Sequence, residues 1–192
     1  CDAAIGSTNL GVDLGGQQEG PIDRDGGVFL YLGEHAEPGT DGGLNASPAR
    51  VWLADQPTDA ASEFGAALAM GDFDADGYDD LVAAQPLHNT PGTSGQNHGA
   101  VRVFRGGPVP TYFGDAPLSV TDADWVFEGQ YSNSGLGKAL TSGDLNDDGV
   151  LDLLITAPEI ALPNTPVRSG AVAVFYGRAG ALPELEADWL AK

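Results

Sequence analysis

The sequence predicts an all-β fold made of repeated four-stranded units of the propeller type. Glycine and proline, with 28 and 13 residues, make about a fifth of the 192-residue chain, which favours short strands joined by turns. Strand-like segments recur with a period of about 72 residues, and each period contains four of them. A small sheet of this kind buries its faces only when neighbouring sheets stack on it, as in the blades of a propeller.

Several recurring segments define the period. A glycine-led apolar strand occurs as "GGVFLYLG" from Gly26, "GAVRVFRG" from Gly99 and "GAVAVFYG" from Gly170, at spacings of 73 and 71 residues. The segment "FGAALAMGD" from Phe64 matches "LGKALTSGD" from Leu136 at a shift of 72 residues. Each period is expected to hold a tryptophan strand, an FG or LG strand, an acidic loop leading into an apolar strand, and the GAV strand, in that order.

The tryptophan segments supply the first strand of each unit in this scheme. "RVWLAD", "ADWVFEG" and "ADWLAK" place Trp52, Trp125 and Trp189 in register, and we expect these side chains to pack between blades rather than to form a sugar-binding platform. The chain is then a single domain with two complete four-stranded blades and strands at each end that complete a shared blade. Its expected parts are an N-terminal segment with one blade strand (1–51), a blade (52–106), a linker loop (107–124), a second blade (125–177) and the first strand of a following blade (178–192).

Two acidic loops, "DFDADGYDD" and "DLNDDGVLD", also lie 72 residues apart. Oxygen donors alternate before a glycine that lets the chain reverse, and this pattern suits the about six to eight oxygens that Ca²⁺ prefers. An EF-hand is excluded because position 12 holds Ala83 and Ile155 instead of glutamate, and Mg²⁺ fits less well because it retains several waters. The alternative is a pair of acidic turns without an ion. The expected ligands of the two Ca²⁺ ions, at positions 1, 3, 5, 7 (through the carbonyl) and 9, are Asp72, Asp74, Asp76, Tyr78 and Asp80 in the first loop and Asp144, Asn146, Asp148, Val150 and Asp152 in the second.

With these motifs the chain resembles the FG-GAP repeat family, whose repeats build the propeller of integrin α subunits and occur in many bacterial surface proteins. The resemblance covers about residues 50–177 and rests on "FGAALAMGDFDADGYDDLVAAQP" and "LGKALTSGDLNDDGVLDLLITAPE", each followed by a GAV strand. Leu136 replaces the aromatic residue of FG, and Gln85-Pro86 stands where Ala-Pro is usual. The resemblance implies propeller-type blades, calcium in both loops and an extracellular or cell-surface location.

The charge balance limits the partners. Eight Lys and Arg residues against 28 Asp and Glu residues give a formal charge of −20, which argues against binding nucleic acid or an anionic membrane surface. No apolar run is long enough to span a membrane.

The single cysteine, Cys1, has three interpretations: a lipid-modified N-terminus of a bacterial lipoprotein, an intermolecular disulfide, or a chance end. Lipidation is slightly favoured, because cleavage before that residue would leave such a start.

The sequence contains no G-x-S-x-G, H-E-x-x-H or phosphate-binding glycine motif, and we expect no enzyme. His35, His88 and His98 lie in loops and are expected at the surface.

We expect an extracellular calcium-binding protein with a structural or adhesive role, as a surface filament subunit that assembles with copies of itself head to tail by strand or blade complementation. A closed monomer is not expected, because about three blades are fewer than propellers use. The alternative is a fragment of a larger cell-surface propeller that binds glycan or protein ligands, or a non-catalytic domain of a surface enzyme.

Overall fold

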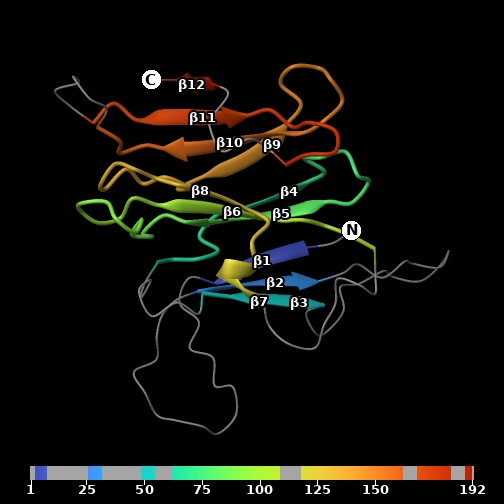
Figure 1. The fold of residues 1–192 in the computed structure, drawn as a ribbon, viewed down its shortest axis with the longest axis horizontal. Coiled ribbons are helices and arrows are strands. Elements are labelled where there is room, and N and C mark those ends of the chain that lie inside the picture. The colour runs from blue at the N-terminus through green and yellow to red at the C-terminus, as the bar shows by residue number, and fades with distance from the viewer. Residues whose placement is uncertain are drawn as a thin grey trace, which may run out of the picture.

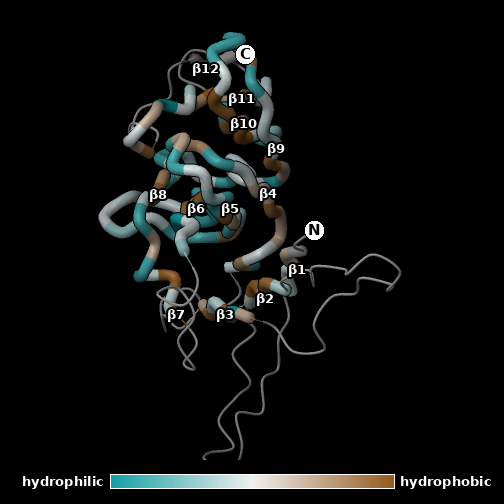
Figure 2. The backbone as a smooth tube through the Cα atoms, turned by 90° about the vertical axis from the view of Figure 1, so that its right-hand side faces the viewer, coloured by the Kyte–Doolittle hydropathy of each residue, from teal (hydrophilic) through white to brown (hydrophobic). Residues whose placement is uncertain are grey.

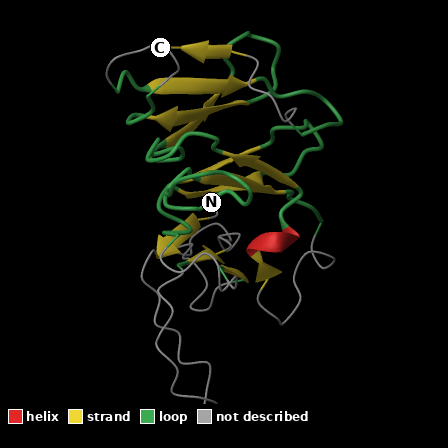
Figure 3. Cartoon of the chain, turned by 60° about the vertical axis from the view of Figure 1, so that its left-hand side comes forward, coloured by secondary structure: helices red, strands yellow, loops and turns green. Residues whose placement is uncertain are grey.

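The computed structural model confirms the all-β prediction: three four-stranded sheets stack in a column (Figures 1 and 3). The only helical element among the described residues is a 3₁₀ turn, η1 (Val120–Asp122), capped by Ser119. The structure describes residues 3–7, 26–31, 49–54, 62–108, 118–161, 168–182 and 189–191.

Each sheet is mainly an antiparallel meander. The N-terminal sheet has the order β1 (Ala3–Ser7), β2 (Gly27–Tyr31), β3 (Arg50–Leu53), β7 (Leu118–Ser119), in which β7 pairs with β3 in parallel. The middle sheet has the order β4 (Leu68–Gly71), β5 (Asp80–Gln85), β6 (Ala100–Phe104), β8 (Trp125–Glu128). The C-terminal sheet has the order β9 (Leu140–Gly143), β10 (Asp152–Ala157), β11 (Ala171–Phe175), β12 (Trp189–Ala191).

The tryptophan strands lie at the other end of each unit from the one expected. Trp125 is on β8, which pairs with β6 of the middle sheet, so the tryptophan strand is the last strand of one blade and not the first strand of the next. A repeat can be divided at any point along its period, and spacing alone does not choose that point. The packing role is confirmed for two tryptophans: Trp52 lies 5.4 Å from the ring of Phe104, and Trp125 lies 5.1 Å from the ring of Phe175, each in the next sheet.

The N-terminal segment contributes more strands than expected. Strand β1 pairs with β2 in the way that β5 pairs with β6, although "AAIGS" contains a single β-branched residue and gives little strand signal. Strands β1 and β12 belong to different sheets at opposite ends of the column, so the described strands do not form a shared blade (Figure 1). Two complete four-stranded sheets carry the acidic loops, as the sequence predicts.

The segment 107–124, expected to be a linker loop, contains regular secondary structure. Its described C-terminal part forms β7 and η1, and Val120 is fully buried in the core beside the N-terminal sheet. This segment therefore crosses from the middle sheet to the edge of the preceding sheet before it returns as β8.

Two apolar layers, one between each pair of neighbouring sheets, hold the three sheets together. In Figure 2 the hydrophobic segments, coloured brown, lie mostly in the strands. Alternate residues of β5 point to opposite faces, so Leu81 and Ala83 pack toward the N-terminal sheet while Val82 and Ala84 pack toward the C-terminal sheet. In β6, Val101 and Val103 belong to the layer toward the C-terminal sheet and Phe104 to the layer toward the N-terminal sheet. The buried apolar residues of β10 all belong to the layer between the middle and C-terminal sheets.

The FG and GAV motifs meet between neighbouring sheets. A Cβ on Gly99 would lie 2.4 Å from the carbonyl oxygen of Leu136, and one on Gly26 would lie 2.3 Å from that of Phe64. Both glycines also have positive φ angles, 81° and 83°. These two glycines are thus required because the FG or LG residue of the next repeat lies directly against their backbones.

Candidate metal centre

The first acidic loop is a tight turn between β4 and β5. The carboxylate of Asp72 accepts hydrogen bonds from the backbone N–H groups of Asp76 (3.1 Å) and Gly77 (2.9 Å). Ala75 and Gly77 adopt left-handed conformations, with φ of 56° and 92°. The aspartate at position 1 thus closes the loop into a tight turn.

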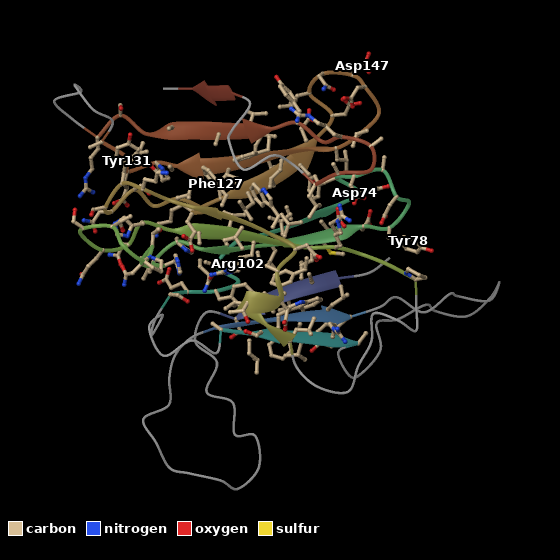
Figure 4. The ribbon with its side chains drawn as sticks, viewed as in Figure 1. Asp74, Tyr78, Arg102, Phe127, Tyr131 and Asp147 are labelled. Carbon is tan, nitrogen blue, oxygen red and sulfur yellow. The ribbon has the colours of Figure 1, made fainter. Side chains whose placement is uncertain are left out.

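The second acidic loop, between β9 and β10, repeats these contacts. Asp144 accepts from the N–H groups of Asp148 (3.2 Å) and Gly149 (2.9 Å), while Asp147 and Gly149 have φ of 60° and 86°. Figure 4 shows Asp74, Tyr78 and Asp147 on the same side of the stacked sheets, at the right of the view, with Tyr131 on the opposite side. The predicted strand–loop–strand hairpins are confirmed, and the acidic loops of both lie on the same side of the stack.

The aspartate at position 9 connects the first loop to the third strand of its sheet. Asp80 is fully buried and accepts from the N–H of Phe73 (3.2 Å) and from the N–H of Gly106 (2.9 Å), just after β6. Desolvation, and to a smaller extent the neighbouring Asp74 and Asp76, raise the pKa of Asp80 from 3.8 to about 6 against the lowering effect of these two hydrogen bonds.

Asp152 has the same role in the second loop. It is fully buried, and its carboxylate accepts from the N–H of Leu145 (2.7 Å) and from the N–H of Gly177 (3.0 Å), just after β11. Both repeats therefore contain, besides the oxygen donors, a buried position-9 aspartate that links the start of the loop to the end of the third strand. We call this pair of hydrogen bonds the latch.

Three carboxylates of the first loop converge on one point. Asp72, Asp74 and Asp80 each offer an oxygen, and these oxygens all lie within 4.8 Å of one another. Oxygens bound to one Ca²⁺ ion at about 2.3–2.6 Å are separated by no more than about twice that distance, so the donor set fits a hard divalent cation. Asp74 is 2% exposed and Asp80 is fully buried, which leaves two of the three carboxylates with little water to solvate them.

The other predicted ligands are arranged differently. Asp76 is exposed and lies outside this group of three, and its carboxylate accepts from the N–H of Tyr78 (2.9 Å), which is itself 42% exposed. In the second loop Asn146 takes the place of Asp74 and donates to Asp148 at 2.9 Å. Within the described part of the chain, only the first loop brings three carboxylates this close together.

Two contacts of the first loop were not predicted from the sequence. Arg105 Nη2 lies 3.1 Å from Asp74 Oδ2. A turn of the next sheet also covers the loop, because the N–H of Arg178 donates to the carbonyl of Phe73 (3.2 Å) and the N–H of Gly180 donates to that of Asp74 (2.6 Å). The one available signal was the 71-residue spacing of the GAV strands, which sets Arg105 opposite the uncharged Tyr176.

Two histidines expected at the surface are buried. His88 is 4% exposed, with its Nε2 3.2 Å from Glu128 Oε1, and His98 is 1% exposed, with its Nε2 3.0 Å from the hydroxyl of Thr93. Their loop packs on the neighbouring connection that follows β8, where Ser134 donates to the carbonyl of His98 at 2.7 Å. Both are buried structural histidines. Cys1 and His35 lie outside the described residues.

Comparison with known proteins identifies the repeats. The family profile described as "FG-GAP repeat" matches residues 64–104 and 136–175. The chain is an FG-GAP repeat protein. The two matched FG-GAP segments run from the FG or LG strand to the GAV strand and contain the acidic loops, and repeats of this family commonly bind calcium.

The FG-GAP protein is similar to parts of larger proteins. It is 31% identical over 118 residues to integrin alpha-PS2 of Drosophila melanogaster, a match that covers 59% of this chain and 8% of the integrin. It is 30% identical over 138 residues to phosphatidylinositol-glycan-specific phospholipase D of Bos taurus (69% and 15%), and 32% identical over 168 residues to that of Rattus norvegicus (84% and 18%). The chain thus spans less than a fifth of the length of these curated relatives. Among the described residues, no helix is both long and apolar enough to cross a membrane.

Proposed function

We propose that this FG-GAP protein binds one Ca²⁺ ion in each acidic loop and acts without catalysis in structure or adhesion, outside the cell or at a bacterial cell surface. The observation that carries the proposal is the convergence of Asp72, Asp74 and Asp80, two of them buried, within one tight turn. Like charges at this distance destabilise the fold unless a cation neutralises them. The second loop repeats the same backbone turn and buried latch, with Asn146 as a neutral oxygen donor.

Calcium titration tests this proposal. Isothermal titration calorimetry should give about two Ca²⁺ ions per chain, and Asp72→Asn and Asp144→Asn should each remove one of them. Saturating Ca²⁺ should raise the melting temperature, since a ligand at about 100 times its Kd stabilises a protein by about 2.7 kcal/mol for each site. An unchanged midpoint in EDTA would contradict a stabilising role for the ion.

We also propose that the chain associates with copies of itself or with a further blade. The C-terminal sheet supports this proposal because, among the residues that the structure describes, nothing covers its outer face as the C-terminal sheet covers the middle one. Leu154 and Val172 are partly exposed, whereas the corresponding residues of the middle sheet, Val82 and Val101, are fully buried. Leu145 is 55% exposed on this side, whereas its counterpart Phe73 is fully buried.

Size in solution tests self-association. Analytical ultracentrifugation in Ca²⁺ should show oligomers that grow with concentration, and Leu145→Asp or Val172→Asp should shift them toward monomer. Electron micrographs would then distinguish a filament from a ring. A monodisperse monomer at high concentration would remove the chain itself as the partner and leave the larger-protein alternative, which the short coverage of the relatives favours.

A second candidate function is that of a non-catalytic domain within a surface enzyme, with a glycan or protein ligand. The similarity to phosphatidylinositol-glycan-specific phospholipase D favours it, although the activity in that name is a property of those proteins. A glycan array and an assay with a phosphatidylinositol-glycan substrate separate these ideas. Hydrolysis by the purified chain would overturn the non-catalytic proposal, and selective glycan binding would favour the second candidate.

A further inference from the structure

The two acidic loops differ at ligand position 3, and they also differ at the residue that contacts the side chain at this position. In the first repeat, Asp74 at position 3 is 2% exposed and forms an ion pair with Arg105, whose Nη2 lies 3.1 Å from Asp74 Oδ2. Arg105 follows β6 directly and its side chain is 39% exposed. The pair therefore joins a partly solvated guanidinium to a carboxylate that has almost no access to water.

In the second repeat both members of this pair are replaced together. Asn146 stands at the position of Asp74, and Tyr176 stands at the position of Arg105. The first loop has four predicted aspartate ligands and one arginine, which leaves three negative charges, and the second loop has three predicted aspartate ligands and no arginine. Arg105 thus offsets the one carboxylate that the second loop lacks.

The ion pair also limits how Asp74 can bind an ion. Its Oδ2 faces Arg105, and its Oδ1 accepts from the N–H of Asp76 at 3.3 Å. One oxygen of Asp74 belongs to the group of donors that lie within 4.8 Å of one another. A carboxylate whose second oxygen is held by a guanidinium offers a cation one oxygen instead of two.

We propose that Arg105 is a built-in counter-cation of the first calcium loop. It neutralises Asp74 when the loop is free of calcium, keeps that carboxylate in place with one oxygen directed at the ion, and lowers the affinity of the loop for Ca²⁺. This inference rests on the proposed function that the loops bind calcium. Its consequence is that Arg105 sets the affinity of the first loop without contacting the ion.

Arg105→Leu tests the inference. Removing a positive charge a few ångströms from a dication in a half-exposed site should strengthen Ca²⁺ binding by the first loop about tenfold. The same variant should melt at a lower temperature than the wild type in EDTA, because Asp74 then remains buried without its partner. A merely structural role for Arg105 would lower both the melting temperature and the Ca²⁺ affinity.

The first loop can be observed separately from the second. Tyr78 belongs to the first loop, where the second has Val150, but Tyr176 stands beside the second loop at the position of Arg105. In a Tyr176→Phe background, the Tb³⁺ luminescence that is excited through tyrosine and lost in Tyr78→Phe therefore reports the first site. Competition of Ca²⁺ against Tb³⁺ then gives the affinity of that site in each variant. Arg168→Leu is the matched control, because it removes the same charge from an exposed ion pair with Glu159 (2.8 Å) and should leave the affinity unchanged within about twofold.

A double variant guards against misfolding. Arg105→Tyr combined with Asp74→Asn copies the second repeat, keeps the net charge of the first loop, and should bind Ca²⁺ with an affinity near that of the second loop. Tighter binding in Arg105→Leu and near-equal sites in the double variant would support the inference. Equal or weaker binding in Arg105→Leu, with the wild type still binding two ions, would overturn the counter-cation role alone, whereas no Ca²⁺ binding by any variant would overturn the proposed function and this inference with it.

Discussion

At the scale of single residues, the aspartates at position 9 have two roles. Asp80 and Asp152 are expected ligands, yet each also accepts two backbone hydrogen bonds that connect the start of its loop to the end of the third strand. A buried N–H group that loses its acceptor costs about 1–3 kcal/mol. These residues are therefore expected to stabilise the protein before any ion binds.

Asp152→Ala measures that calcium-independent role. The substitution leaves the N–H groups of Leu145 and Gly177 without their acceptor, and we expect the free energy of unfolding in EDTA to fall by about 2–4 kcal/mol. Urea denaturation followed by circular dichroism gives the value. Asp79→Asn, an exposed charge next to the other latch, is the control and should change it by less than about 0.5 kcal/mol. If Asp152→Ala lowered the free energy of unfolding by no more than Asp79→Asn does, the two hydrogen bonds of the latch would contribute nothing to stability.

Because its pKa is raised, Asp80 should change the stability of the protein with pH in the opposite direction to an ordinary aspartate. Burial raises its pKa to about 6 in the folded protein, so between about pH 4 and pH 6 the native state binds more protons than the unfolded state. The contribution of this group to stability in EDTA is therefore greatest below pH 4 and is lost as the pH rises through 6. Relative to Asp80→Asn, the wild type should lose up to about 3 kcal/mol of unfolding free energy between pH 4 and pH 7.

The same proton competes with calcium. Below pH 6 the apparent Ca²⁺ affinity of the first loop should fall by roughly tenfold per pH unit, because Asp80 must release its proton to bind the ion. Tb³⁺ competition at pH 5, 6 and 7 measures this dependence. Parallel stability profiles for the wild type and Asp80→Asn, together with a pH-independent affinity, would contradict the raised pKa.

At the scale of strands and loops, the two interfaces between sheets differ in how well they are filled. A cavity of about 200 Å³ lies between the middle and C-terminal sheets, next to Ala157 and Ala173. The residues at the corresponding positions of the other interface are Gln85 and Arg102, which are buried and hydrogen-bonded to each other through the arginine Nε. Two alanines thus leave open the space that a polar pair fills one repeat earlier.

Filling this cavity should stabilise the protein. Ala173→Leu adds apolar atoms to a space lined mainly by carbon, and we expect a gain of about 1 kcal/mol, seen as a higher melting temperature both in EDTA and in Ca²⁺. Ala179→Leu, a change of the same size in the exposed turn after β11, is the control and should have little effect. A loss of stability in Ala173→Leu would mean that the surrounding strands cannot accept the larger side chain.

The sequence predicts the loops well because their donors are contiguous. Spacing along nine residues determines which side chains face inward, and the 72-residue shift repeats that pattern. The same spacing does not determine where a blade begins, so Trp125 was expected to open a sheet that it does not belong to. Strand β1 was missed because its composition is weak, and the Arg105–Asp74 pair was missed because it joins residues 31 positions apart through tertiary packing.

At the scale of the whole molecule, the two loops occupy unequal places in the stack. The first loop lies against the next sheet, because the N–H of Gly180 donates to the carbonyl of Asp74 and that of Arg178 donates to Phe73. The second loop lies on the outer side of the last sheet, where Leu145 is exposed. An ion in the first loop therefore supports a junction between sheets, whereas an ion in the second supports its own hairpin.

Hydrogen exchange should detect this difference. Adding EDTA should raise the exchange rates of amides in both loops, and the effect of the first loop should extend to the amides of Arg178 and Gly180 in the next sheet. Asp72→Asn in Ca²⁺ should reproduce the loss of protection in that turn, and Asp144→Asn should not. Equal protection of the turn in the two variants would show that the first ion does not support the junction.

The contacts between sheets have the same form at both junctions: tryptophan meets phenylalanine at one point, and a GAV glycine meets an FG or LG residue at another. Each repeat therefore presents on one side what it accepts on the other. A gene encoding such a chain can gain or lose one whole period and keep these two contacts at every junction, because the newly adjacent repeats meet through the same residue types. Array length is then free to vary among descendants while the architecture of each joint stays the same.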